Sequence, residues 1–139
     1  MRHGRSILSE ANMWRTVRTA LAGLDPVRVE NPALPGTPDV NYIEGWIELK
    51  QEDEWPKRES TPLRVDHFTP QQRVWLTRRV KSGGRAFMLI KVDRDWLLFR
   101  GDVAAKIVGH ATRQQLIRLA LRHWPGKLIH EELRECLTN

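Results

Sequence analysis

The stretches Gly36-Thr37-Pro38-Asp39-Val40 and Gly45-Trp46-Ile47-Glu48-Leu49-Lys50 decide the fold of this chain of 139 residues. Two runs typical of β-strands lie in this region, over residues 39–43 and 46–51. A turn at Glu44-Gly45 separates the two runs. We therefore expect a hairpin of adjacent antiparallel strands here.

The residue order of the second strand predicts that charged side chains suited to catalysis project from one face of the hairpin. Successive side chains of a strand point to opposite sides, so Ile47 and Leu49 would face the core while Glu48 and Lys50 project together. Asp39 on the neighbouring strand would lie within reach of that pair. Two carboxylates that converge from adjacent strands make an oxygen-rich site suited to Mg²⁺ or Mn²⁺. A lysine beside one ligand can orient or polarise a metal-bound water, which is the equipment of phosphodiester hydrolysis. The alternative interpretation is a solvated strand with a cross-strand ion pair.

Patterns on both sides of the hairpin predict the remaining elements. Apolar periodicity, capping residues and Gly or Pro breakers predict helices over 9–24, 69–81, 102–108, 112–124 and 127–137, and further strands over 27–30, 86–92 and 96–100. Residues 52–69 are rich in charge and proline and lack a helical period, so we expect a long loop, with a short extended piece at 63–65. The order of the elements predicts an α/β fold in which helices flank one mixed sheet.

Length and composition indicate the class of protein. The length suits one domain, which we expect to span residues 1–139. No run approaches the roughly 20 apolar residues of a membrane helix, and no apolar segment follows the basic N-terminus as in a secretory signal. The single cysteine, Cys136, makes no internal disulfide. We therefore expect a cytoplasmic protein with no membrane partner.

The net charge favours a polyanionic partner. The sequence lacks the residues of two common kinds of site, the phosphate-binding loop and the zinc site. The chain has 23 Lys plus Arg against 17 Asp plus Glu, a net charge of +6, which attracts phosphate backbones. Gly83-Gly84 is not followed by the Lys and Ser or Thr of a phosphate-binding loop, so we expect no nucleotide cofactor. The histidines and Cys136 lack the spacing of a zinc site.

The hairpin motif resembles the signature of the PD-(D/E)XK nuclease superfamily. Here it takes the form of Pro38-Asp39, eight intervening residues, and then Glu48-Leu49-Lys50. The resemblance implies a restriction-endonuclease-like core, over about residues 9–100, in which Asp39 and Glu48 bind Mg²⁺ or Mn²⁺. It also implies that the Leu49 carbonyl is a metal ligand and that Lys50 assists the nucleophilic water. Residues 102–139 would form a helical C-terminal extension.

Three further stretches are similar to the same superfamily. Glu10 lies on the apolar stripe of the first helix, where the superfamily often carries a glutamate that approaches the metal; a helix-dipole role is the equal alternative. Thr69-Pro70-Gln71-Gln72 resembles the helix start of the VRR-NUC branch and of Holliday junction resolvase-like relatives, in which Gln72 would face the site. An incidental glutamine on a capped helix is the alternative there. Gly83-Gly84 followed by an apolar strand matches the last part of the core.

Basic residues near this core are candidates for binding nucleic acid. The segment after the strand expected over residues 46–51 carries Trp55, Lys57 and Arg58. The tryptophan could stack on an unpaired base or fold back as a small apolar cluster. Arg78 and Arg79 lie on the helix that carries Gln72, where they would contact the phosphate backbone or form a solvated face.

These features together predict a function. The expected activity is that of a Mg²⁺- or Mn²⁺-dependent deoxyribonuclease that cuts branched, flap or four-way-junction DNA, and the small chain suits a bacterial or phage-encoded protein. A non-catalytic nucleic-acid-binding module on the same fold is the alternative. A restriction-type endonuclease would need a recognition region for which there is little room. Resolution of a junction would need a homodimer, for which apolar stripes within 117–124 and 129–137 are candidate surfaces unless they pack on the domain itself.

Overall fold

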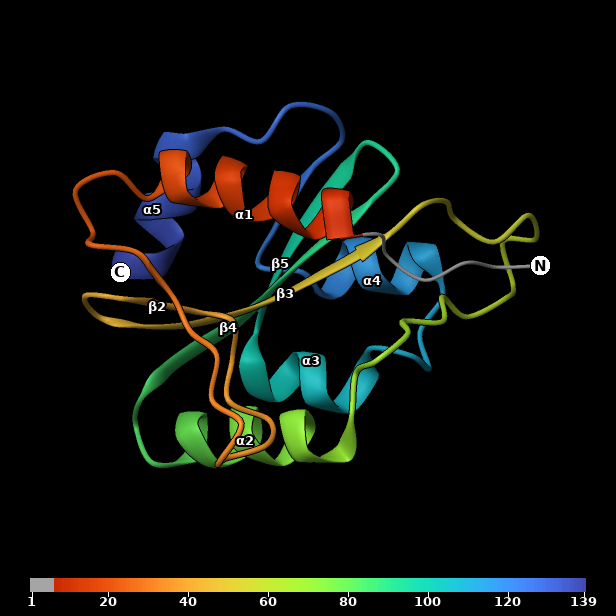
Figure 1. Cartoon of the computed structure of the whole chain (residues 1–139). Helices are drawn as coiled ribbons and strands as arrows, with labels where there is room; N and C mark the ends of the chain where they lie inside the picture. The colour runs from red at the N-terminus through yellow and green to blue at the C-terminus, as the bar shows by residue number, and fades with distance from the viewer. Residues whose placement is uncertain (1–6) are drawn as a thin grey trace.

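Across the described residues, six strands form one mixed sheet in the order β1-β2-β3-β4-β5-β6 (Figure 1). The computed structural model describes the backbone of residues 7–139 and the side chains of residues 11–139. The strands are β1 (Val27–Arg28), β2 (Val40–Tyr42), β3 (Gly45–Glu52), β4 (Arg85–Val92), β5 (Asp95–Arg100) and β6 (Arg122–Trp124). β3 and β4 are parallel, and the other neighbouring pairs are antiparallel. The predicted α/β fold with a mixed sheet is therefore confirmed.

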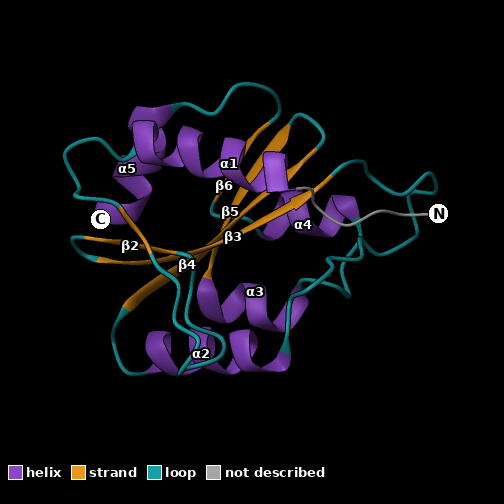
Figure 2. Cartoon of the chain, in the orientation of Figure 1, coloured by secondary structure: helices purple, strands orange, loops and turns teal. Residues whose placement is uncertain are grey.

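Helices cover both faces of this sheet (Figure 2). They are α1 (Ile7–Ala20), α2 (Pro70–Lys81), α3 (Gly101–Ile107), α4 (Arg113–Leu119) and α5 (His130–Thr138). α1 and α5 lie together on one face, whereas α2 and α3 lie on the other (Figure 1). Along β4, Phe87 and Leu89 enter the core beneath α1 and α5, and Met88 and Ile90 enter the core beneath α2 and α3. The sheet is thus buried on both faces, as is usual for strands covered by crossover helices. No helix within residues 7–139 is both long and apolar enough to span a membrane.

The parallel pairing of β3 with β4 determines what lies over the centre of the sheet. A parallel pair needs a crossover connection, because the chain must return to the same end of the sheet. Here residues 53–69 and α2 make that crossover, which brings α2 against the face opposite α1. Thr69 caps α2 and Pro70 occupies its first turn, as the sequence predicts. The even-numbered side chains of β3 consequently point beneath α2.

The C-terminal region differs from the prediction of helices alone. The helix predicted over 112–124 is wrong in its second half, because α4 ends at Leu119 and residues 122–124 form β6. β6 pairs with β5, and Trp124 is buried in the core beneath α1. Pairing with an open strand edge and burial of a tryptophan outweigh a weak helical periodicity. Residues 102–139 therefore contain, besides the helical residues of α3, α4 and α5, a strand that completes the sheet.

Most side chains of the two apolar stripes in this region pack within the chain. Leu133 and Leu137 of α5 are fully buried against α1 and the sheet. Ile117 packs on the opposite core, and Leu121 is exposed. The residues 117–124 thus lie on two elements and share no single helical face.

Some predicted boundaries shift by a few residues. α1 ends at Ala20 rather than at residue 24, and α5 begins at His130. The extended piece predicted at 63–65 is not a strand. Leu63 is instead buried, and its N–H donates to the Ala111 carbonyl at 3.0 Å. This contact holds the long loop against the segment between α3 and α4.

Candidate active site

The side chains of β3 alternate between the two cores as the sequence predicts. Ile47 and Leu49 pack beneath α1, whereas Trp46, Glu48 and Lys50 lie on the side of α2. This second face is not open to solvent, because Glu48 and Lys50 expose only 1% and 2% of their surface. A carboxylate and an ammonium group buried together need partners, since each would otherwise lose its hydration without compensation.

Asp39 is the first partner of this buried pair. It precedes β2, and the register that pairs Val40 with Ile47 places Asp39 opposite Glu48. Its Oδ2 accepts a hydrogen bond from the Leu49 N–H at 2.9 Å, which fixes the carboxylate beside β3. Burial raises the pKa of Glu48 well above its usual range, the negative charge of Asp39 raises it further, and Lys50 opposes both effects. Burial and the neighbouring Asp39 carboxylate therefore both favour the neutral form of Glu48.

Lys50 joins the carboxylates to the long loop. Its Nζ lies 3.3 Å from Glu48 Oε2. The same ammonium donates to the His67 carbonyl at 2.9 Å and lies 5.7 Å from the centre of the Phe68 ring. His67 adopts a left-handed backbone conformation with φ of 64°, which is uncommon for a residue with a side chain. The end of the loop is therefore bent so that a main-chain oxygen meets the lysine.

Gln72 approaches the site from α2 and has two roles. Its Oε1 accepts from the Thr69 N–H at 3.0 Å, and the Thr69 hydroxyl accepts from the Gln72 N–H at 3.2 Å, so the two residues form a capping box. Its Nε2 also donates to Glu48 Oε2 at 3.3 Å. The glutamine is thus both a helix cap and a neighbour of the buried glutamate, which combines the two interpretations that the sequence allows.

The turn before Asp39 contacts the same end of α2. Gly36 has φ of +94°, and a Cβ at this position would lie 2.5 Å from the Gln71 carbonyl oxygen and 2.9 Å from the Gln72 nitrogen. Only glycine permits both this conformation and this close approach. The close contact ties the segment that leads to Asp39 to the helix turn that carries Gln72.

One oxygen of Glu48 stands out within the described residues. Glu48 Oε1 is buried and has no hydrogen-bond partner there. Buried carboxylate oxygens are nearly always paired, so an unpaired one needs an explanation, of which a bound water or ion is one and a catalytic role is another. The described residues contain no cluster of three or more His, Cys, Asp or Glu side chains suited to a metal ion. The available donor set is therefore two carboxylates, with main-chain oxygen and solvent left to complete it.

Among the remaining predicted site residues, those whose side chains the structure describes do not gather around Glu48. The Glu10 side chain lies outside the described residues, although its backbone is part of α1. Lys57 and Arg58 are exposed on the loop. Arg78 and Arg79 are both exposed on α2, and the Arg79 guanidinium lies 4.5 Å from the ring centre of Trp75.

Trp55 has a structural partner that the sequence does not reveal. Its indole N–H donates to Asp95 Oδ2 at 2.7 Å, and the Arg113 guanidinium lies 5.0 Å from its ring centre. Asp95 is buried and also lies 2.6 Å from His123 Nε2. These residues come from the loop, β5, α4 and β6. Trp55 thus anchors the start of the loop, as the alternative interpretation of a tryptophan that folds back requires.

Sequence reasoning missed the Asp95 cluster and the His67 carbonyl for the same reason. Each depends on contacts between segments far apart in the chain, and a main-chain oxygen carries no signal in the residue type. Comparison of the chain with protein-family models gives no match, and a search among curated proteins finds no relative either. The interpretation of the site therefore depends on its own geometry and chemistry.

Proposed function

We propose that this protein is a Mg²⁺- or Mn²⁺-dependent nuclease that hydrolyses phosphodiester bonds in DNA, on a restriction-endonuclease-like form of the α/β fold. One observation carries the proposal. Asp39, Glu48 and Lys50 meet on one face of two paired segments, and Glu48 Oε1 is buried there without a protein partner among the described residues. A purely structural ion pair would not need a second carboxylate that raises the pKa of the first.

The donor set fits a hard divalent cation. Asp39 and Glu48 would hold the ion, and the Leu49 carbonyl is the third expected ligand. A cation bound by these groups would stabilise negative charge on the phosphate and lower the pKa of a water molecule. Lys50, whose Nζ lies 3.3 Å from Glu48 Oε2, would orient that water or balance charge on the scissile phosphate. Gln72 fixes Glu48 through its hydrogen bond to Oε2.

The kind of DNA is inferred from the motif and from charge. The start of α2 resembles the VRR-NUC and Holliday junction resolvase-like branch, so the proposed substrate is branched, flap or four-way-junction DNA. The net charge of +6 supports binding to the backbone, with little dependence on base sequence. A homodimer would supply the two incisions that a junction needs.

A non-catalytic nucleic-acid-binding module is the second candidate, and a specific observation favours it. Glu48 and Lys50 are buried, and the Lys50 ammonium donates a hydrogen bond to the His67 carbonyl at 2.9 Å. Catalysis would require the end of the loop to move away from Lys50 when DNA binds. Binding alone would not require this movement.

Cleavage separates the two candidates. Linear, flap and four-way-junction DNA are incubated with the protein in Mg²⁺, Mn²⁺ or EDTA. We expect cleavage that depends on the cation, and a loss of at least about 100-fold for Asp39→Ala, Glu48→Ala and Lys50→Ala, because each removes a metal ligand or a water-orienting group.

Matched variants control for loss of charge. Glu44→Ala lies on the turn of the same hairpin, and Lys91→Ala lies on the neighbouring strand β4. Both should retain activity, and circular dichroism should show that all five variants are folded. Full activity of folded Glu48→Ala in the presence of a confirmed metal requirement would contradict the proposal. Binding of DNA with no cleavage in any cation would favour the second candidate.

A further inference from the structure

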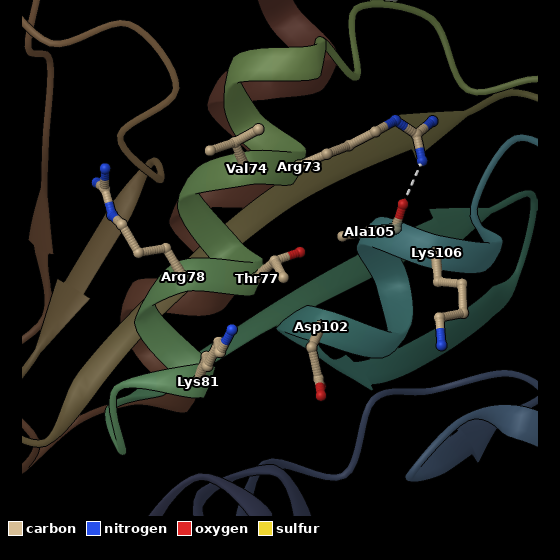
Figure 3. A pocket seen from close by; sticks show the side chains of 8 residues that line it. All are labelled: Arg73, Val74, Thr77, Arg78, Lys81, Asp102, Ala105 and Lys106. Carbon is tan, nitrogen blue, oxygen red and sulfur yellow. Dashed lines mark hydrogen bonds between the residues drawn. The ribbon is translucent and has the colours of Figure 1, made fainter.

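A groove runs between α2 and α3, on the outside of the molecule (Figure 3). It has a volume of about 760 Å³. Val74, Thr77 and Lys81 line it from α2, and Ala105 and Lys106 line it from α3. None of the residues of the proposed active site belongs to its lining, so it is a separate feature of the surface.

The lining of this groove carries a strong positive charge. Four cationic side chains line it, namely Arg73, Arg78, Lys81 and Lys106. Its single acid, Asp102, is held by Arg100 through hydrogen bonds of 2.6 and 2.8 Å, and this pairing lowers the pKa of Asp102. In the part of the chain that the structure describes, neither Lys81 nor Lys106 has a salt-bridge partner. Their charge is therefore available to an anion from outside.

Arg73 gives the groove a rigid end. Its guanidinium donates to the Ala105 carbonyl at 2.8 Å (Figure 3). The same guanidinium lies 4.1 Å from the centre of the Phe68 ring. An arginine held in this way loses little freedom when it meets a phosphate, so it binds at a lower entropic cost than a free side chain. The fixed Arg73 and the exposed Lys81 and Lys106 together suit a chain of phosphates better than a single small anion.

The position of the groove relative to the site follows from helix geometry. Gln72 points to the sheet, and Lys81 follows it by nine residues, which places Lys81 on roughly the opposite side of α2 at about 100° per residue. The groove and the site nevertheless approach one another at Phe68, because the Lys50 ammonium and the Arg73 guanidinium both lie against that ring. A DNA strand or arm that leaves the site past Phe68 would reach the Arg73 end of the groove.

We propose that the α2–α3 groove is a second DNA-binding site, which holds the sugar–phosphate backbone away from the point of cleavage. The inference rests on the proposed function, because it takes DNA to be the polyanion that the protein meets. It assigns to Arg73, Lys81 and Lys106 a role in affinity and none in the chemical step.

The test is the salt dependence of DNA binding. Affinity of the full chain for a four-way junction and for duplex DNA is measured by fluorescence anisotropy in EDTA, so that cleavage does not interfere. The groove variant is Lys81→Gln with Lys106→Gln, and the matched control is Arg118→Gln with Lys127→Gln, which are exposed positions outside the groove and the site. We expect the slope of log Kd against log salt to fall by about 2 in the groove variant, and affinity at low salt to fall by about tenfold or more. The control should change both quantities less.

The outcomes separate the groove from the nuclease proposal. Wild-type affinity and slope in the groove variant, while wild-type protein cuts DNA, would overturn the groove inference alone. A groove-dependent slope without cation-dependent cleavage would support the groove and contradict the nuclease. If the wild-type protein does not bind DNA, both fail. Poly-glutamate is the second probe: groove-dependent binding of poly-glutamate with groove-independent binding of DNA would assign the groove to an acidic protein segment and overturn the inference.

Discussion

Glu48 combines two properties that act in the same direction when no metal is bound. It is almost fully buried, and it faces a second carboxylate across the hairpin. Both properties favour its neutral form and raise its pKa, although Lys50 lies close enough to oppose them. A divalent cation would reverse this preference, because a metal ligand must be ionised. The protonation of Glu48 and metal binding are therefore expected to be linked.

This linkage predicts how stability depends on pH. A carboxyl whose pKa is raised in the folded state stabilises the fold below its unfolded pKa, near 4.3, and this contribution is lost as the pH rises through the folded pKa. We expect the free energy of unfolding of the metal-free protein to decline over that range, with a slope from this group of at most about 1.4 kcal/mol per pH unit. Glu48→Gln should flatten the slope.

Thermal melts in EDTA and in Mn²⁺, at a series of pH values, measure this effect. Mn²⁺ should raise the melting temperature of the wild-type protein more as the pH rises, and it should have little effect on Glu48→Gln. Glu44→Gln, on the exposed turn of the same hairpin, is the control and should behave as wild type. A wild-type slope in folded Glu48→Gln would show that another group causes the pH dependence.

The sequence predicts which face of the sheet each side chain of β3 occupies, but not how deeply that side chain is buried. Alternation is a local property of a strand, so the common side of Glu48 and Lys50 follows from residue order alone. Their near-complete burial depends on α2 and on the Phe68 end of the loop, which come from later in the chain. The carbonyl of His67 belongs to the same distant segment, which explains why no residue pattern could identify it.

Among the elements, the turn before β2 and the start of α2 form one unit. Gly36 touches the main chain of Gln71 and Gln72, and Gln72 in turn caps α2 and reaches Glu48. The turn that leads to Asp39 therefore has a direct influence on where α2 begins. A change at Gly36 should be felt in stability and also at the site.

We expect Gly36→Ala to destabilise the fold more than a substitution at a partly exposed position usually does. The φ of +94° is unfavourable for alanine, and the added Cβ would meet the Gln71 carbonyl oxygen at 2.5 Å, so the turn must move away from α2. We expect the free energy of unfolding to fall by about 1–3 kcal/mol. Chemical denaturation measures this loss.

Gly23→Ala is the matched control, because Gly23 has a similar φ of +92° but nothing within 4 Å of its Cβ position. The difference in the free energy of unfolding between the two variants measures the effect of the close approach separately from that of the backbone strain. If Gly36→Ala and Gly23→Ala cost the same, contact with α2 does not contribute to the position of the turn.

The elements also show where local patterns are sufficient. α2 is predicted to within one residue because its cap, its first-turn proline and its Gly stop are all local signals. β6 is not predicted, because Arg122-His123-Trp124 becomes a strand only when it pairs with β5 and buries Trp124. A three-residue strand has no period of its own, so tertiary pairing alone defines it.

For the whole molecule, the structure changes the expectation about assembly. The stripe of α5 that was a candidate dimer surface is used within the chain, with Leu133 and Leu137 fully buried. The large apolar side chains that remain exposed among the described residues are spread over several elements: Val27, Leu34, Ile43, Val74, Leu119, Leu121 and Ile129. Stable interfaces usually bury about 1,200–2,000 Å² with a contiguous apolar centre. Scattered residues of this kind do not supply such a centre.

We therefore expect the protein to be monomeric at micromolar concentration without DNA, and to form a pair of subunits only on a four-way junction. Two copies on one junction would be brought together by the DNA, which raises their effective concentration and offsets the lack of a large interface. Multi-angle light scattering of the protein alone, with duplex DNA and with junction DNA measures the number of subunits in each state.

Leu119→Lys with Leu121→Lys, at two exposed positions at the end of α4, should leave the free protein unchanged. A stable dimer without DNA that this double variant dissociates would locate an interface at the end of α4 and contradict assembly on DNA. A strict monomer that cuts a single strand of the junction would rule out paired incisions while leaving the nuclease activity itself in place.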